Sequence, residues 1–251
     1  MQEQDLAVII LAAGKGTRMQ NSLAKVLIPV AGKPTLEFVL DTAATLNPSR
    51  ILVVVGHQAD RVKEIFSNRG LEFVLQKEQL GTGHAARLTE QKLTNFEGII
   101  LVLCGDMPLI KTKTLQQLLL EYRKKKAKCT VLTLKSKAKN DFGRIIRNEK
   151  GSFLKIVEHR EATEKEKEVD EFNSGVYCFD KELFFKALSS IHDNNTQKEY
   201  YLTDTLEYSV KIGCPVASVQ TEDADEIIGI NTPDDLKRVE QLLKNRPSPS
   251  E

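Results

Sequence analysis

The chain has 251 residues, of which 41% are hydrophobic and 28% are charged, and its formal net charge is +1 at pH 7. This balance is ordinary for a globular protein and gives no sign of nucleic acid or an acidic membrane surface as a partner. No apolar run approaches the roughly 18 residues of a membrane-spanning helix, and the N-terminus lacks a signal-peptide pattern. We therefore expect a cytoplasmic protein.

Short apolar runs rich in Val, Ile and Leu alternate with amphipathic stretches through the first half of the chain. The runs predict strands buried on both faces, over residues 7–13, 50–56, 71–76, 98–106 and 129–135. The stretches between them place apolar residues at helical spacing, over 34–46, 59–68, 83–93 and 112–126. This alternation predicts an α/β fold with a Rossmann-like, mostly parallel sheet flanked by helices.

The second half predicts a smaller mixed lobe, from about residue 140 to 225, inside a main domain of residues 1–228. Its expected elements are a hairpin over 143–159, an exposed loop or short helix over 161–171, a strand over 171–180, a helix over 181–191 and a strand over 216–222. Residues 229–251 are expected to form a C-terminal helix, which Asn231 or Thr232 caps, and a frayed tail.

The four cysteines, Cys104, Cys129, Cys178 and Cys214, lie far apart and form no C-x-x-C pair. Three of them fall inside strand-like apolar runs, where cysteine usually behaves as a small buried hydrophobe. We therefore expect neither a zinc site nor a disulfide framework.

The loop after the first predicted strand holds two glycines, Gly14 and Gly16, and three cations, Lys15, Arg18 and Lys25. It matches neither the P-loop pattern nor the dinucleotide-binding fingerprint, in which a third glycine would be required. Glycines let backbone N–H groups approach phosphate oxygens, and Arg18 and Lys25 add positive charge where a leaving group becomes negative. A nucleoside triphosphate is the favoured ligand, and a polar turn with solvated cations is the alternative.

Two other loops, over residues 76–83 and 105–109, also follow predicted strands directly. The carboxyl ends of parallel strands meet at one edge of a sheet, so we expect all three loops to lie together there. Asp106 in the last of these loops is a candidate ligand for Mg²⁺, with Asn231 as a second oxygen donor. The alternatives are a structural aspartate in a Gly-Asp turn and an asparagine that only caps a helix.

The motif LAAGKGTRM (11–19), followed by Lys25-Val26-Leu27, resembles the signature of sugar-phosphate nucleotidyltransferases, also called pyrophosphorylases. Further motifs in chain order are similar to the N-acetylglucosamine-1-phosphate uridylyltransferase branch of that family. They are QKEQLGTGHA (76–85), GDMPL (105–109), FGRI (142–145), IVEH (156–159), FNSG (172–175), EYYLTD (199–204) and GIN (229–231). The resemblance extends from about residue 6 to residue 245.

The resemblance implies a reaction in which UTP and N-acetylglucosamine 1-phosphate give UDP-N-acetylglucosamine and pyrophosphate, with Mg²⁺ as cofactor. The attacking phosphate is already an anion, so no protein base is required, and His84 and His159 are interpreted as structural. The resemblance implies roles for fifteen residues: Arg18 and Lys25 in catalysis; Leu11, Ala12, Gly14, Gln76, Gly81 and Thr82 in nucleotide binding; Asp106 and Asn231 in metal binding; and Gly143, Glu158, Asn173, Tyr201 and Thr203 in sugar binding.

Three positions depart from the family pattern: Ala24 replaces a common proline, Cys104 a Tyr or Ser, and Phe142 a Tyr. The substrate is therefore open to an alternative, another sugar 1-phosphate or nucleotide such as glucose 1-phosphate or dTTP. A further alternative for the function is a catalytically inactive paralogue that senses nucleotides. The sequence holds no hexapeptide repeat, so we expect no left-handed β-helix acetyltransferase domain and no trimer built by that domain. A monomer or weak dimer is expected instead.

Overall fold

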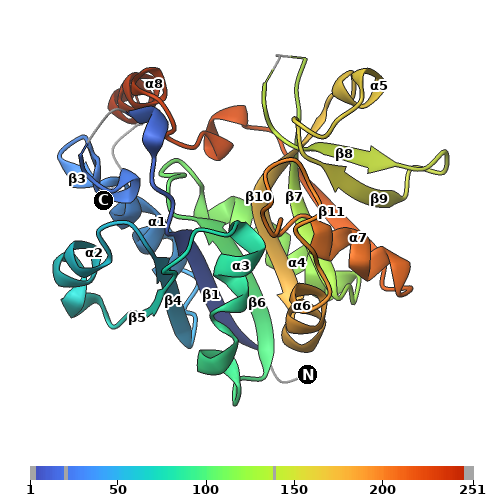
Figure 1. Cartoon of the computed structure of the whole chain (residues 1–251), viewed down its shortest axis with the longest axis horizontal. Coiled ribbons are helices and arrows are strands. Elements are labelled where there is room, and N and C mark those ends of the chain that lie inside the picture. Colours follow the sequence, from blue (N-terminus) through green and yellow to red (C-terminus); the bar gives the residue numbers. More distant parts are fainter. Residues whose placement is uncertain (1–3, 20–21, 138–139, 246–251) are drawn as a thin grey trace.

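A mixed β-sheet forms the centre of the molecule (Figure 1), in a computed structural model that describes residues 4–19, 22–137 and 140–245. Within these residues seven strands lie in the order β11-β7-β10-β6-β1-β4-β5, and β8 and β9 join beside β10. Along this order β10 runs antiparallel to β6 and β7, whereas β1 is parallel to β4 and β6. The bounds are β1 Asp5–Ala12, β4 Arg50–Val55, β5 Glu72–Leu75, β6 Gly98–Cys104, β7 Cys129–Lys135, β10 Glu171–Asp180 and β11 Val216–Thr221.

The strands that the apolar runs predicted in the first half all form, and the mostly parallel sheet is confirmed. Ile9 in β1 pairs with Leu52 on one side and with Val102 on the other, and all three side chains are fully buried. Such central strands lack a solvent-facing side, which is why their sequences are continuous apolar runs rather than alternating ones.

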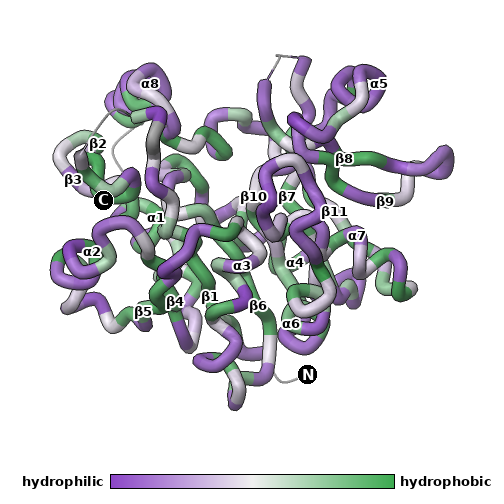
Figure 2. The backbone as a smooth tube through the Cα atoms, viewed as in Figure 1, coloured by the Kyte–Doolittle hydropathy of each residue, from purple (hydrophilic) through white to green (hydrophobic). Residues whose placement is uncertain are grey.

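Helices cover both faces of the sheet, and the hydrophobic residues lie along the strands between them (Figure 2). Alternate residues of β1 show the division: Val8 and Ile10 face one layer, and Ala7 and Ile9 face the other. The first layer holds α1 Thr35–Ala44, α2 Ala59–Ile65 and α4 Thr112–Lys124, and the second holds α3 Thr82–Arg87, α6 Lys181–Leu188 and α7 Asp204–Lys211. No helix in the described ranges is long and apolar enough to cross a membrane.

The helices predicted over 59–68 and 83–93 are both shorter than expected. Each ends early, as α2 or α3, and a short 3-10 turn follows it. Thr89 closes α3, because its hydroxyl donates to the Ala86 carbonyl at 2.6 Å and its N–H donates to the same carbonyl at 3.1 Å. A side chain that bonds to the helix backbone in this way competes with continuation of the helix.

The C-terminal helix α8 (Pro233–Asn245) packs against a small hairpin that the sequence patterns did not predict, β2 (Pro29–Val30) and β3 (Lys33–Pro34). Of the two predicted caps, Thr232 bonds to the first turn: its hydroxyl accepts from the Asp235 N–H at 3.2 Å, and the Asp235 carboxylate accepts from the Thr232 N–H at 2.8 Å. The residue after this cap is Pro233, the first residue of the helix, and a proline is tolerated there because no N–H is required at that position. The predicted frayed tail lies outside the described residues.

The lobe begins with the hairpin predicted over 143–159, which forms as β8 (Arg144–Arg147) and β9 (Phe153–Val157). Its turn contains Gly151 at a φ of 76°, a conformation that favours glycine. The charged stretch after it forms the short helix α5 (Glu164–Lys167), one of the two predicted alternatives. The domain boundaries given above stay a prediction.

Candidate functional site

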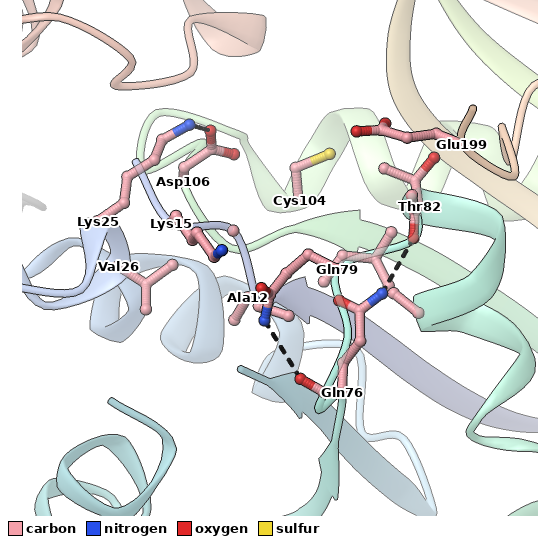
Figure 3. A pocket seen from close by; sticks show the side chains of 15 residues that line it. Ala12, Lys15, Lys25, Val26, Gln76, Gln79, Thr82, Cys104, Asp106 and Glu199 are labelled. Carbon is pink, nitrogen blue, oxygen red and sulfur yellow. Dashed lines mark hydrogen bonds and ion pairs between the residues drawn. The ribbon is translucent and has the colours of Figure 1, made fainter. Parts of the chain in front are cut away.

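A cavity of about 540 Å³ opens at the carboxyl ends of β1, β5 and β6 (Figure 3). Its wall takes residues from each of the three loops that follow these strands, which confirms the predicted convergence of the loops. The lining residues are Leu11, Ala12, Ala13, Gly14, Lys15, Lys25, Val26, Gln76, Gln79, Gly81, Thr82, Ala85, Cys104, Asp106 and Glu199.

Two cationic side chains and two side chains with acceptor oxygens meet at one end of this cavity. The Lys25 ammonium contacts the Asp106 carboxylate, and it donates to Asn231 Oδ1 at 2.7 Å. Arg18 Nη2 donates to the same Asn231 oxygen at 3.0 Å. Figure 3 shows the lysine reaching along the cavity wall to the aspartate. The structure thus brings together four residues that come from three separate sequence motifs.

Backbone hydrogen bonds hold Asp106 in place from two sides. The N–H of Gly105 donates to the Leu11 carbonyl at 2.9 Å, and the N–H of Ile230 donates to the Asp106 carbonyl at 3.0 Å. A Cβ atom at Gly229 would lie 3.1 Å from Asp106 Oδ2, so the glycine permits this close approach. These bonds fix the backbone of Asp106 independently of the lysine that contacts its carboxylate.

The loop that carries Lys25 is tied to the start of α2. The N–H of Ala24 donates to Gln58 Oε1 at 2.9 Å, and Gln58 Nε2 donates to the Ser22 carbonyl at 2.6 Å. Gln58 has a φ of 54°, in the left-handed region. A proline in place of Ala24 would have no N–H for this bond. The alanine, although it departs from the family pattern, therefore allows a hydrogen bond that holds the loop in place.

Gln76 lies at the other end of the cavity with a fixed amide orientation. Its Nε2 lies 3.1 Å from the Gly81 carbonyl oxygen and 3.1 Å from His84 Nδ1. Burial and the nearby Arg87 lower the pKa of His84, which keeps the ring neutral and lets Nδ1 accept. Since the amide N–H₂ is committed to these acceptors, the Oε1 oxygen is left for a donor from outside the described chain. His84 is thus an orienting residue, in line with its structural interpretation.

The loop with Gly81 and Thr82 is bonded to the segment that leads into α7. Tyr200 joins it twice: its N–H donates to the Leu80 carbonyl at 2.8 Å, and its carbonyl accepts from the Gly83 N–H at 2.7 Å. The Thr82 hydroxyl accepts from the N–H of Leu202, two residues further along the segment, at 3.1 Å. Gly81 has a φ of 105°, and a Cβ there would lie 2.6 Å from the Tyr200 carbonyl oxygen. Only glycine fits this contact.

Four of the five residues assigned to the sugar form two hydrogen-bonded pairs, and the Tyr201 hydroxyl donates to Gln197 at 3.0 Å instead. The Thr203 hydroxyl donates to Glu158 Oε1 at 3.0 Å, and burial raises the pKa of this glutamate. The Asn173 N–H donates to the Gly143 carbonyl at 2.8 Å. Glu158 and Tyr201 line a second cavity of about 490 Å³ and not the cavity at the carboxyl ends of β1, β5 and β6. The structure therefore does not gather the predicted sugar residues around the nucleotide cavity.

The Asn173 side chain is fixed by its neighbours in β10. Its Oδ1 accepts from the Tyr177 hydroxyl at 3.0 Å and from the Gly175 N–H at 3.1 Å. Cys104 lies against the same bend, where its thiol donates to the Gly175 carbonyl at 3.6 Å, and burial raises its pKa to about 12. Cys104 is therefore a neutral contact between the cavity and the lobe. All four cysteines are free thiols, as expected.

Lys15, Gln79 and Glu199 line the cavity although none was assigned a role from the sequence. Gln79 and Glu199 stand inside the motifs QKEQLGTGHA and EYYLTD, so the motifs contained the signal and only the residue choice missed it. Among the described residues, no group of three or more His, Cys, Asp or Glu side chains is arranged to hold a metal ion.

Residues 8–198 match the family model of the MobA-like NTP transferase domain. The chain belongs to the MobA-like NTP transferase family. Among curated proteins it is 46% identical over 238 residues to the bifunctional protein GlmU of Bacillus cereus strain G9842, and 42% identical to that of Bacillus subtilis strain 168. Each match covers 95% of this chain and 52% of the relative, so the chain spans about half the length of these relatives.

A crystal structure of a UDP-glucose pyrophosphorylase with UDP-glucose has the same fold as this NTP transferase. Its TM-score is 0.80, with 20% sequence identity, and the match covers 96% of this chain and 100% of the other. The agreement places the parallel sheet and its flanking helices in the nucleotidyltransferase fold that the sequence predicted.

Proposed function

We propose that the chain is a uridylyltransferase that converts UTP and N-acetylglucosamine 1-phosphate into UDP-N-acetylglucosamine and pyrophosphate. One observation carries this proposal: Arg18, Lys25, Asp106 and Asn231 converge at one end of a cavity, and Gln76 presents an oriented amide at the other. The GlmU relatives and the NTP transferase family support the same kind of chemistry.

The cationic end suits displacement at the α-phosphorus of a triphosphate. A phosphate oxygen of the sugar phosphate forms the new bond, the bond between the α-phosphorus and its bridging oxygen breaks, and pyrophosphate leaves. The attacking oxygen is already an anion, so the main needs are alignment and neutralisation of charge. Arg18 and Lys25 provide positive charge beside the position of the phosphates.

Asp106 and Asn231 fit a divalent cation. Both contact one ammonium group, so their oxygens already converge on a point that a cation can occupy. Carboxylate and amide oxygens are donors that Mg²⁺ accepts, with phosphate oxygens and water completing its shell. We infer that Mg²⁺ binds here with the triphosphate and supplies charge neutralisation.

The oriented amide favours uracil over cytosine. Gln76 Oε1 can accept a hydrogen bond from N3–H of uracil, and Gly81, which lines the same cavity, would offer its N–H to a base carbonyl. The N3 atom of cytosine is an acceptor and would face this oxygen without a proton between them. A site that leaves buried polar groups unpaired discriminates strongly against the wrong base.

The sugar would be held by Gly143, Glu158, Asn173, Tyr201 and Thr203. Glu158 offers a carboxylate acceptor, and the fixed Asn173 side chain offers an amide for hydroxyl or acetamido groups. The segment that bonds to the Gly81 loop also leads to Thr203, so sugar and base contacts share one support.

Pyrophosphate release tests the proposal across five nucleoside triphosphates and several sugar 1-phosphates, with and without Mg²⁺. We expect the highest kcat/KM with UTP, N-acetylglucosamine 1-phosphate and Mg²⁺. Turnover of dTTP and glucose 1-phosphate without turnover of UTP would transfer the assignment to another sugar nucleotide. An absence of turnover with every pair would contradict an enzymatic role.

A further inference from the structure

We propose that Lys25 occupies the divalent-cation site before nucleotide binds, so that the metal enters only with a triphosphate that draws the lysine away. This inference rests on the proposed nucleotidyl transfer. It adds that the metal binds together with the nucleotide and not before it. It assigns Lys25 two positions, one on Asp106 and Asn231 and one on the phosphates.

The contacts of Lys25 place its charge on the oxygens proposed as metal ligands. The ammonium contacts Asp106 and donates to Asn231 Oδ1 at 2.7 Å, and Arg18 donates to the same amide oxygen at 3.0 Å. A metal bound at the convergence of these oxygens would take the position of the ammonium. The lysine and the metal therefore compete for one place.

The lysine is guided along its stem, while its ammonium can move. A Cβ at Gly16 would lie 2.8 Å from Lys25 Cβ and 3.5 Å from Lys25 Cδ, so the stem lies against the bare glycine backbone. Gly16 has a φ of 62°, which also favours glycine. The ammonium stands at the end of a flexible four-carbon chain. Asp106 is held by its own backbone, so the lysine can leave without moving it.

Charge decides which cation wins. Without nucleotide, Lys25 contacts Asp106, and both Lys25 and Arg18 donate to the Asn231 amide oxygen, so a further divalent ion meets repulsion from two cations. Mg²⁺ also gives up its water reluctantly, and it usually binds to proteins through one or two carboxylates together with substrate phosphates. A triphosphate brings several negative charges and gives both cations new partners. Metal and nucleotide should therefore raise one another's affinity to the same extent.

Binding of Mn²⁺, measured by electron paramagnetic resonance without nucleotide or sugar phosphate, tests this competition. We expect Lys25→Met to bind Mn²⁺ at least about tenfold more tightly than the wild-type chain, because a unit charge near 4 Å repels a divalent ion substantially even in water. Lys25→Gln should show the same direction of change. Combining Lys25→Met with Asp106→Asn should abolish the gain, and UTP alone should remove the advantage of Lys25→Met.

Lys15→Met is the matched control, because Lys15 lines the same cavity but contacts neither oxygen among the described residues. We expect it to change Mn²⁺ affinity by less than about threefold, as removal of a distant, screened charge should. Equal affinities of the wild-type and Lys25→Met chains would overturn the inference, as would an equal gain in Lys15→Met. Neither result depends on turnover, so pyrophosphate release separately tests the proposed function.

Discussion

The nucleotide cavity and the sugar-binding lobe are built in different ways. The cavity lies between loops that follow parallel strands, and backbone bonds such as Gly105 N–H to the Leu11 carbonyl hold its walls. In the lobe, side chains hold other side chains, as Tyr177 holds Asn173 and Thr203 holds Glu158. Under the proposed function, the strand topology would set the position of the phosphates, and packing within the lobe would set the recognition of the sugar.

This comparison predicts separate kinetic effects for the two regions. Substitutions in the cavity should change turnover or the KM for the nucleotide. Substitutions in the lobe should change the KM for the sugar phosphate and leave the KM for the nucleotide unchanged.

Asp106→Ala should reduce kcat by at least about 10³-fold, because it removes a charged ligand at the site of phosphoryl transfer. Folding should be retained, since the Gly105 N–H and the carbonyl of residue 106 keep their backbone bonds to Leu11 and Ile230. Steady-state pyrophosphate release and circular dichroism check the two parts. Asp225→Ala, which loses a surface ion pair with Arg238 at 2.7 Å, is the control and should keep full activity. Wild-type rates in Asp106→Ala would remove this residue from the metal site.

Gln76→Ala should lower the preference for UTP over CTP by about 10- to 100-fold, the usual cost of a lost discriminating hydrogen bond in a buried site. Competition assays with both nucleotides measure the ratio directly. The KM for N-acetylglucosamine 1-phosphate should not change. A higher KM for the sugar phosphate with an unchanged nucleotide preference would place Gln76 in the wrong region.

Tyr177→Phe should raise the KM for the sugar phosphate by about three- to tenfold, because Asn173 loses the hydroxyl that orients it. The KM for UTP should stay at the wild-type value. Tyr122→Phe is a matched control, since this tyrosine is also buried but lies on α4. An equal rise in the two KM values would break the proposed separation between the regions.

Asp204→Asn should stabilise the fold above pH 6 by about 1 kcal/mol, after allowance for solvent screening of this partly exposed group. Burial raises the pKa of Asp204 to about 6, so the folded chain favours the protonated form. Wild-type stability should therefore fall as the pH rises through about 6, and the difference between the proteins should vanish near pH 4. Urea unfolding of the wild-type and Asp204→Asn proteins near pH 4 and above pH 6 measures this difference.

The sequence predicted β1 and β6, two of the strands that end at the cavity, well because these strands are buried on both faces. Continuous apolar runs mark such strands, and their order in the chain already places the loops that follow them at one edge. The short hairpin β2–β3 was missed, since two-residue strands with prolines carry no periodic signal. The insertion of antiparallel β10 between β6 and β7 was also beyond a single sequence, because pairing depends on contacts between distant segments.

The site was predicted residue by residue but not as a network. Lys25 and Asn231 are 206 positions apart in the chain, and nothing local indicates that one donates to the other. The resemblance assigned them to different ligands, the triphosphate and the metal. The orienting roles of His84 and Tyr177 were likewise invisible, since each depends on the geometry of a neighbouring amide.

The most direct test of the central claim is the stoichiometry of the products from UTP and N-acetylglucosamine 1-phosphate in the presence of Mg²⁺. Mass spectrometry of the sugar nucleotide and an enzymatic assay of pyrophosphate follow the same reaction. We expect equal amounts of UDP-N-acetylglucosamine and pyrophosphate, and we expect both products to be lost when the metal is chelated. Release of UMP or phosphate without the sugar nucleotide, or no product at all, would contradict it.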